Sequence, residues 1–123
     1  MPVRLVRLKT RADFLRVAAG RARAVRPGVI VQAAPQPDPS EPPARPRVGY
    51  TASRRVGNAV VRNRAKRRLR AAAAAVLPRC GAEGVDYVLI ARAGTAARPY
   101  AELLGDLEGA LRQLAGQRRP EEG

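Results

Sequence analysis

The sequence predicts an α+β fold in which a single layer of mixed sheet, with about four strands, packs against helices. Three segments carry apolar residues at helical spacing, and short β-branched or alternating segments lie between them. Their order along the chain is α-β-β-β-α-β-α, which suits one sheet with helices packed on it. With 123 residues the chain can bury one modest core, so residues 1–123 are expected to form one domain.

The first helix is expected in the N-terminal segment, where apolar residues recur at helical spacing: Leu5, Leu8, Ala12, Leu15 and Ala19. Thr10 or Asp13 can cap this helix, and Gly20 ends it. A strand is predicted at residues 29–31, a β-branched run that follows a Pro-Gly pair. Residues 34–46 contain most of the prolines and predict a flexible or extended loop between strands.

The next strand is predicted at residues 47–53, where apolar side chains alternate with small and polar ones. Residues 54–57 are expected to form a turn or a short strand. Residues 86–92 are almost entirely apolar, which favours a strand at the centre of the sheet. Residues 101–114 predict a final amphipathic helix, and the polar tail 117–123 is expected to fray.

The most informative segment is the helix predicted between the strands at residues 47–53 and 86–92. Asn58 is a suitable N-cap, and Pro78 is expected to end the helix at about Leu77. One narrow apolar stripe runs along it: Val61, Ala65, Leu69, Ala72 and Val76. Residues 62–70 hold six cationic side chains and one amide with no acid, and like charges one turn apart repel. The helix is therefore expected to dock through its stripe and to present its cations to a phosphate backbone.

The whole chain is strongly basic, with 24 Lys and Arg against ten Asp and Glu, a net charge of +14. Such a charge favours polyanionic partners, nucleic acid first and an anionic membrane surface second. Nearly all the cations are arginine, which suits phosphate oxygens, although a genome biased toward Arg and Ala explains the preference equally well. A single cysteine, Cys80, and the lack of an apolar leader or spanning segment predict a cytoplasmic protein that does not enter membranes.

The sequence predicts no catalytic side chain and no metal site. Histidine is absent, which removes the commonest general base and a common metal ligand. The ten acids are scattered, whereas a metal-dependent nuclease needs carboxylates that converge. Cys80 has no histidine to activate it, and neither Ser40 nor Ser53 has a base nearby in the sequence.

Residues 47–70, RVGYTASRRVGNAVVRNRAKRRLR, resemble the protein subunit of bacterial ribonuclease P. The hallmark of that family is the Arg-Asn-Arg helix, here Arg62-Asn63-Arg64. Residues 8–14 and 86–92 resemble it too, so the similarity spans roughly residues 5–114. The resemblance implies a left-handed crossover around the basic helix, against the usual handedness. It also implies the fold of the second domain of a small-subunit ribosomal protein.

The resemblance also implies a function. Such a protein binds a large catalytic RNA, and the complex removes the 5′ leader of precursor tRNA. The RNA holds the catalytic Mg²⁺, and the protein, one copy per RNA and monomeric when free, lowers the magnesium requirement. Two rivals are a general structured-RNA-binding or ribosome-associated basic protein, and a nuclease that needs no RNA subunit; the lack of histidines argues against the latter.

Two surfaces follow from the resemblance. The surface for the catalytic RNA comprises Asn58, Arg62, Asn63, Arg64, Lys66, Arg67, Arg68 and Arg70. Asn58 is expected to act mainly as an N-cap, whereas Asn63, unfavourable in mid-helix, is expected to face the RNA.

The second surface is a cleft for the leader between the sheet and the first helix, with Phe14, Ser53, Arg54, Arg55 and Arg92. The family's second aromatic is Ala18 here and the first strand has no aromatic, so base stacking is expected to be weak. Phe14 fits a core position equally well, and Tyr50 and Tyr87 fit packing positions better than stacking positions.

Overall fold

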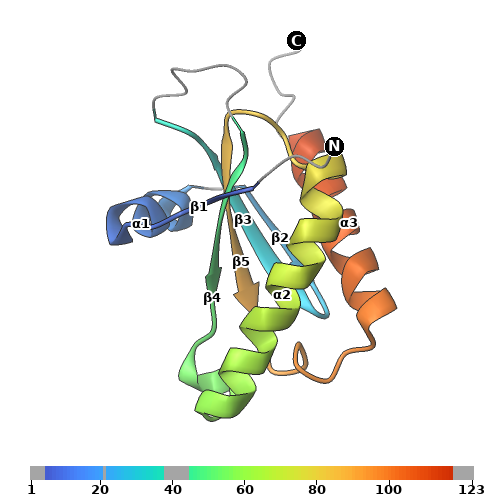
Figure 1. Cartoon of the computed structure of the whole chain (residues 1–123). Helices are drawn as coiled ribbons and strands as arrows, with labels where there is room; N and C mark the ends of the chain where they lie inside the picture. Colours follow the sequence, from blue (N-terminus) through green and yellow to red (C-terminus); the bar gives the residue numbers. More distant parts are fainter. Residues whose placement is uncertain (1–4, 21, 38–44, 118–123) are drawn as a thin grey trace.

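A computed structural model of the chain describes residues 5–20, 22–37 and 45–117, which form a five-stranded sheet with three α-helices (Figure 1). The strands are β1 (Val6–Arg7), β2 (Ala22–Arg26), β3 (Val29–Pro35), β4 (Arg47–Thr51) and β5 (Val85–Ala91). The helices are α1 (Arg11–Ala19), the 3₁₀ turn η1 (Arg54–Val56), α2 (Ala59–Cys80) and α3 (Tyr100–Gln117). The strand order is β1-β4-β5-β3-β2, with β5 at the centre as its sequence predicts.

The sheet is mixed because β5 pairs parallel with β4 and antiparallel with β3. Helices α2 and α3 cover one face of it, and α1 lies against the other (Figure 1). The main core fills the α2–α3 side, where Val31, Val48 and Leu89 meet leucines of both helices. A smaller cluster under α1 is built on Leu8, Val17 and Val88, so α1 has the weaker apolar attachment.

The sheet has five strands rather than about four. The edge strands β1 and β2 escaped prediction, and the short strand considered at residues 54–57 is wrong, because Arg54–Val56 form the 3₁₀ turn η1. The two residues of β1 pair parallel with β4, too short a run to show alternation. The β2 sequence, ARAVR, alternates, but arginines occupy its more exposed positions. The first helix was expected to include Leu5 and Leu8, which is wrong: this stretch runs beside β4, with the Leu8 N–H donating to the Val48 carbonyl, and Thr10 caps α1.

The boundaries of the other elements differ by a few residues. Helix α2 continues past Pro78 to Cys80, contrary to the prediction. A proline in the last turn removes only one helical hydrogen bond, here toward Ala74 on the exposed side, and the Gly81 N–H still donates to the Leu77 carbonyl. In the Pro-rich segment, residues 34 and 35 belong to β3, while residues 38–44 lie outside the described residues, as do residues 118–123 of the tail.

Candidate RNA interface

Helix α2 begins at a corner that its sequence specifies closely. The Asn58 Oδ1 accepts a hydrogen bond from the Val61 N–H at 3.0 Å, so Asn58 is the N-cap that the sequence predicts. Gly57 just before it has a φ of 150°, and a Cβ there would lie 2.9 Å from Val61. Only glycine fits this backbone, and the corner therefore fixes the direction in which α2 leaves the sheet.

The cations of α2 lie in three rows, because residues four apart share a helix face. The rows are Arg62–Lys66–Arg70, Asn63–Arg67 and Arg64–Arg68. The opposite side of the helix is the buried seam, which includes Ala65, Leu69, Ala72 and Val76 as predicted. The docking side and the cationic side are thus separated as the periodicity indicates.

The most outward part of α2 carries Asn63, Arg64 and Arg67, all exposed. The side chains of Arg64 and Arg67 make no hydrogen bond or ion pair with any residue that the structure describes. The sequence contains no acid between residues 47 and 82, so no neighbour along this segment neutralises them. Their guanidinium groups are free to contact an external polyanion.

The first row turns toward β4. The Arg70 guanidinium lies over the ring of Tyr50, 5.9 Å from its centroid, within the range of a cation–π contact. Burial raises the pKa of the Tyr50 phenol, and the positive charges of Arg70 and Arg7 offset part of that rise. Tyr50 is thus a packing residue, as expected, and the face of its ring contacts the Arg70 guanidinium.

Arg68 differs from its neighbours because it is engaged within the protein. Its Nη1 donates to the carbonyls of Thr95 and Ala96 at 2.7 and 3.0 Å, and its Nη2 donates to the Arg98 carbonyl. These contacts hold the loop between β5 and α3. Arg68 therefore has a structural role that its place in the basic run conceals.

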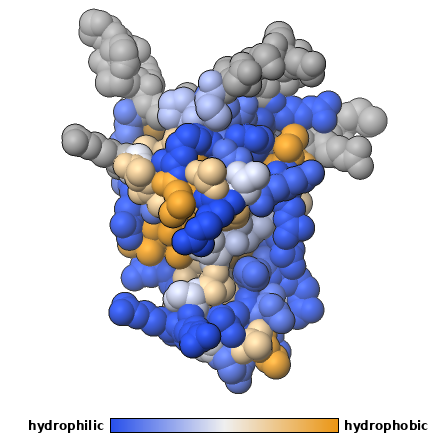
Figure 2. Space-filling model, turned by 90° about the vertical axis from the view of Figure 1, so that its left-hand side faces the viewer, coloured by the Kyte–Doolittle hydropathy of each residue, from blue (hydrophilic) through white to orange (hydrophobic). Residues whose placement is uncertain are grey.

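The sheet face on the α1 side is only partly covered. Figure 2 shows this side, where weakly polar and apolar surface is surrounded by hydrophilic residues. We call its uncovered part the open face; it consists of the partly or fully exposed residues Arg23, Val25, Ile30, Gln32, Thr51 and Ile90. Phe14 of α1 is half-buried at its border, and no tyrosine lies on this face.

The other residues predicted for the leader lie at the ends of strands. Arg54 and Arg55 are exposed in η1, between the end of β4 and the start of α2. The Ser53 Oγ accepts from the Arg55 N–H at 3.3 Å and so caps η1. Arg92 follows β5, and its Nη1 donates to the Arg26 carbonyl at 2.7 Å. Arg54 and Arg55 thus connect the open face to α2, while Ser53 and Arg92 already hold internal contacts.

Replacing Gly49 with alanine is expected to lower the free energy of unfolding by about 1–3 kcal/mol. The added Cβ would lie 2.5 Å from the Phe14 Cε1, so the ring must leave the sheet. Denaturant unfolding measures the loss. Gly105→Ala is the matched control, since its Cβ would meet nothing within 4 Å and should stabilise α3 slightly. Equal stability of the Gly49 variant and wild type would contradict this packing.

No helix among the described residues is both long enough and apolar enough to cross a membrane. Within residues 5–20, 22–37 and 45–117, no three His, Cys, Asp or Glu side chains come together as a metal site would require.

The fold and the unneutralised cationic helix define a class: a small, basic α+β protein built to contact a polyanion. The comparisons identify the family. The family model described as Ribonuclease P matches residues 3–115. The chain therefore belongs to the ribonuclease P protein family, the protein component of the ribonucleoprotein enzyme that processes the 5′ end of precursor tRNA. This confirms the family and the general function that the sequence resemblance implies.

Individual relatives agree. The ribonuclease P protein component of Paramagnetospirillum magneticum is 53% identical over 114 residues, covering 93% of this chain and 86% of the relative. That of Gluconacetobacter diazotrophicus is 47% identical over 121 residues, covering 98% and 100%. The solved RNase P proteins of Staphylococcus aureus (TM-score 0.68, 24% identity, 86% and 92% covered) and Thermotoga maritima (0.67, 21%, 87% and 96%) share the fold.

Proposed function

We propose that the chain binds the catalytic RNA of ribonuclease P through the outward side of α2 and the 5′ leader through the open face. The observation that carries this proposal is the pair Arg64 and Arg67, whose side chains are exposed and have no partner among the described residues. Lys66, Arg62 and Arg70 extend the cationic surface to both sides, and Asn63 adds an amide that can hydrogen-bond the RNA. By neutralising phosphates, the protein lowers the repulsion between two RNAs that must lie close together.

The leader part of the proposal assigns contacts to the border of the open face. Arg54 and Arg55 meet leader phosphates, and Phe14 offers the only aromatic ring on this side among the described residues. Because Phe14 packs on Gly49 and is half-buried, it provides an apolar edge more readily than a free stacking plane. The leader is therefore held mainly through its backbone, with little discrimination among bases.

The assignment of Mg²⁺ is also part of the proposal. The described residues offer no converging set of ligands and do not fit a resident Mg²⁺, so we derive no step through the ion. The RNA carries the catalytic centre, and the protein, a monomer bound to one RNA in the cytoplasm, lowers the concentration of Mg²⁺ that the RNA needs. The left-handed sense of the β4–α2–β5 crossover belongs to the same proposal.

Cleavage of precursor tRNA at low Mg²⁺ tests the proposal. We expect cleavage only when this chain and a bacterial ribonuclease P RNA are mixed, because the chain has no catalytic centre and the RNA alone lacks enough phosphate neutralisation at low Mg²⁺. The affinity of the chain for the ribonuclease P RNA should fall as the salt concentration rises, with a log–log slope of about −0.7 to −0.9 per phosphate contact. Cleavage by the chain alone would place the catalytic centre in the protein and overturn the proposal. Equal affinity for unrelated structured RNAs would favour a general RNA-binding role.

A further inference from the structure

A carboxylate lies buried in the central strand, under α1. Asp86 belongs to β5, and its side chain has no exposed surface (0 %). A charge in such a place is costly unless it is paired and hydrogen-bonded. Asp86 pairs in register with Arg47 of β4, so the two side chains extend from the same side of the sheet.

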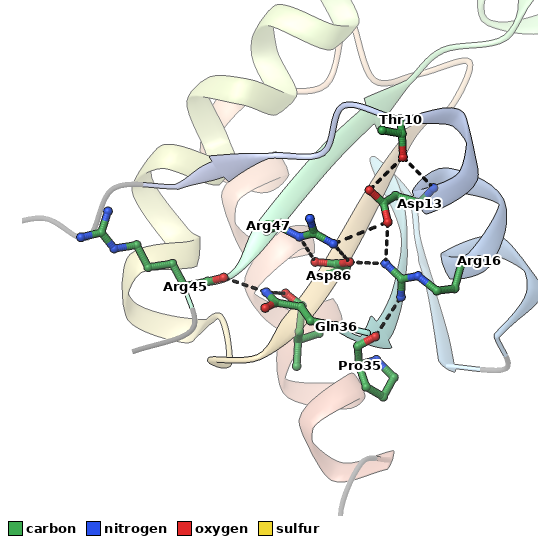
Figure 3. Close-up of polar contacts among 9 residues, drawn as sticks. Thr10, Asp13, Arg16, Pro35, Gln36, Arg45, Arg47 and Asp86 are labelled. Carbon is green, nitrogen blue, oxygen red and sulfur yellow. Dashed lines mark hydrogen bonds and ion pairs between the residues drawn. The ribbon is translucent and has the colours of Figure 1, made fainter. Parts of the chain in front are cut away.

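Two arginines from different elements satisfy this carboxylate (Figure 3). Arg47 binds it as a fork, with Nε donating to Oδ1 at 2.7 Å and Nη2 donating to Oδ2 at 2.6 Å. Arg16 of α1 reaches the same Oδ2 through its Nη2, and its Nη1 donates to the carbonyl of Pro35 at 2.8 Å. One side chain of α1 is therefore fastened to β5 and to the end of β3.

Asp13 completes the cluster on the side of α1. Its Oδ1 accepts from Arg16 at 3.2 Å and lies 3.5 Å from the Arg47 Nη2. The Thr10 hydroxyl donates to its Oδ2, and this bond, together with Arg16 and Arg47, holds the pKa of the Asp13 carboxyl below its usual value. We call these four residues, Asp13, Arg16, Arg47 and Asp86, the α1 anchor. Their charges balance, so the anchor is not a phosphate site.

The apolar attachment of α1 is small by comparison. The helix has nine residues, too few to be stable alone, and only Val17 among them is fully buried. Phe14, which borders the open face, is carried by the same helix. Whatever fixes α1 therefore also fixes Phe14 relative to the sheet.

We infer that Asp86 is a positioning residue: through Arg16 and Arg47 it holds α1, and with it Phe14, at the distance from the open face that the leader requires. The inference rests on the proposed function, since it assigns the leader to this face. Asp86 touches no RNA in this scheme. Its effect reaches the leader only through the placement of α1.

The fold supplies a matched control in a second buried carboxylate. Asp106 of α3 accepts from the Gly28 N–H at 2.9 Å and from the Arg98 Nε at 2.6 Å. It resembles Asp86 in burial and in its arginine partner, but it ties α3 to the turn between β2 and β3. Asp106→Asn should therefore destabilise the protein without releasing α1.

The experiment compares wild type, Asp86→Asn and Asp106→Asn in the reconstituted holoenzyme. Substrates are one precursor tRNA with its leader and the same tRNA without it. For Asp86→Asn we expect the affinity for the leader-bearing substrate to fall about tenfold or more, because small misplacements of a binding group are costly. The affinity for the leaderless tRNA should stay unchanged. Amides of residues 15–19 should exchange hydrogen about tenfold faster, while those of β5 should not.

The possible outcomes distinguish the proposed leader role of the open face from the positioning role of Asp86. A wild-type holoenzyme that binds both substrates equally would overturn the proposed leader role itself. The positioning role alone would be overturned if Asp86→Asn still preferred the leader-bearing tRNA to the leaderless one. It would also be overturned if Asp106→Asn lost that preference to the same extent. Should Asp86→Asn fail to fold, Arg16→Gln makes the same test. It detaches α1 while leaving Asp86 bound by the Arg47 fork.

Discussion

Replacing Arg64 and Arg67 together with alanine is expected to weaken binding to ribonuclease P RNA about 100-fold or more, since each of the two lost hydrogen bonds to a charged group contributes about 1.5 kcal/mol or more. The log–log salt slope should become shallower by about 1.4 to 1.8, the share of two phosphate contacts. Stability should change little, because both side chains are exposed and make no internal bond with any described residue. Titration of the RNA at several salt concentrations measures both quantities.

The control for this variant removes the same charge elsewhere. Arg79 and Arg112 are exposed and share Glu108, at 3.7 and 2.8 Å. Their double alanine variant also lowers the net charge by two, but it should leave the salt slope as in wild type. If both variants lose affinity equally, the protein attracts RNA through its total charge, and the outward side of α2 has no special role.

Replacing Arg68 with alanine is expected to act on the fold instead. The change removes the hydrogen bonds to the carbonyls of Thr95, Ala96 and Arg98, and the free energy of unfolding should fall by about 2–4 kcal/mol. Its neighbour Arg67 makes no such bond within the described residues, so Arg67→Ala should remain within about 0.5 kcal/mol of wild type.

Denaturant unfolding of the two single variants decides between the roles of these adjacent arginines. Arg68→Lys keeps the charge but cannot reach three carbonyls in a fork, so it should recover only part of the stability. If Arg68→Ala is as stable as wild type but binds RNA more weakly, Arg68 contacts the RNA, as the sequence resemblance implies.

Sequence reasoning succeeds where one physical pattern dominates. The apolar run of β5 predicts a central strand, and the stripe of α2 predicts which side docks. Asn58 caps α2 because an amide oxygen accepts well there. These features depend on local chemistry alone, and the structure confirms them.

The remaining features depend on contacts between distant segments. The two residues of β1 become a strand only because β4 lies beside them. Arg68 is recognisable as internal only once the loop at Thr95 is in place. Asp86 did carry a signal, a carboxylate inside an apolar strand, which predicts a buried partner but not its identity. Which cations of α2 contact RNA stays a prediction.

The placement of the acidic residues affects the stability of the chain when no RNA is bound. Among the described residues, five acidic side chains lie within ion-pair distance of arginines: Asp13, Asp86, Glu102, Asp106 and Glu108. These acidic side chains are thus engaged in ion pairs that hold α1 and α3 in place. The surplus of +14 must be balanced from outside. Repulsion among the unbalanced charges lowers the stability of the free subunit, and a polyanion that binds the folded chain stabilises it by mass action.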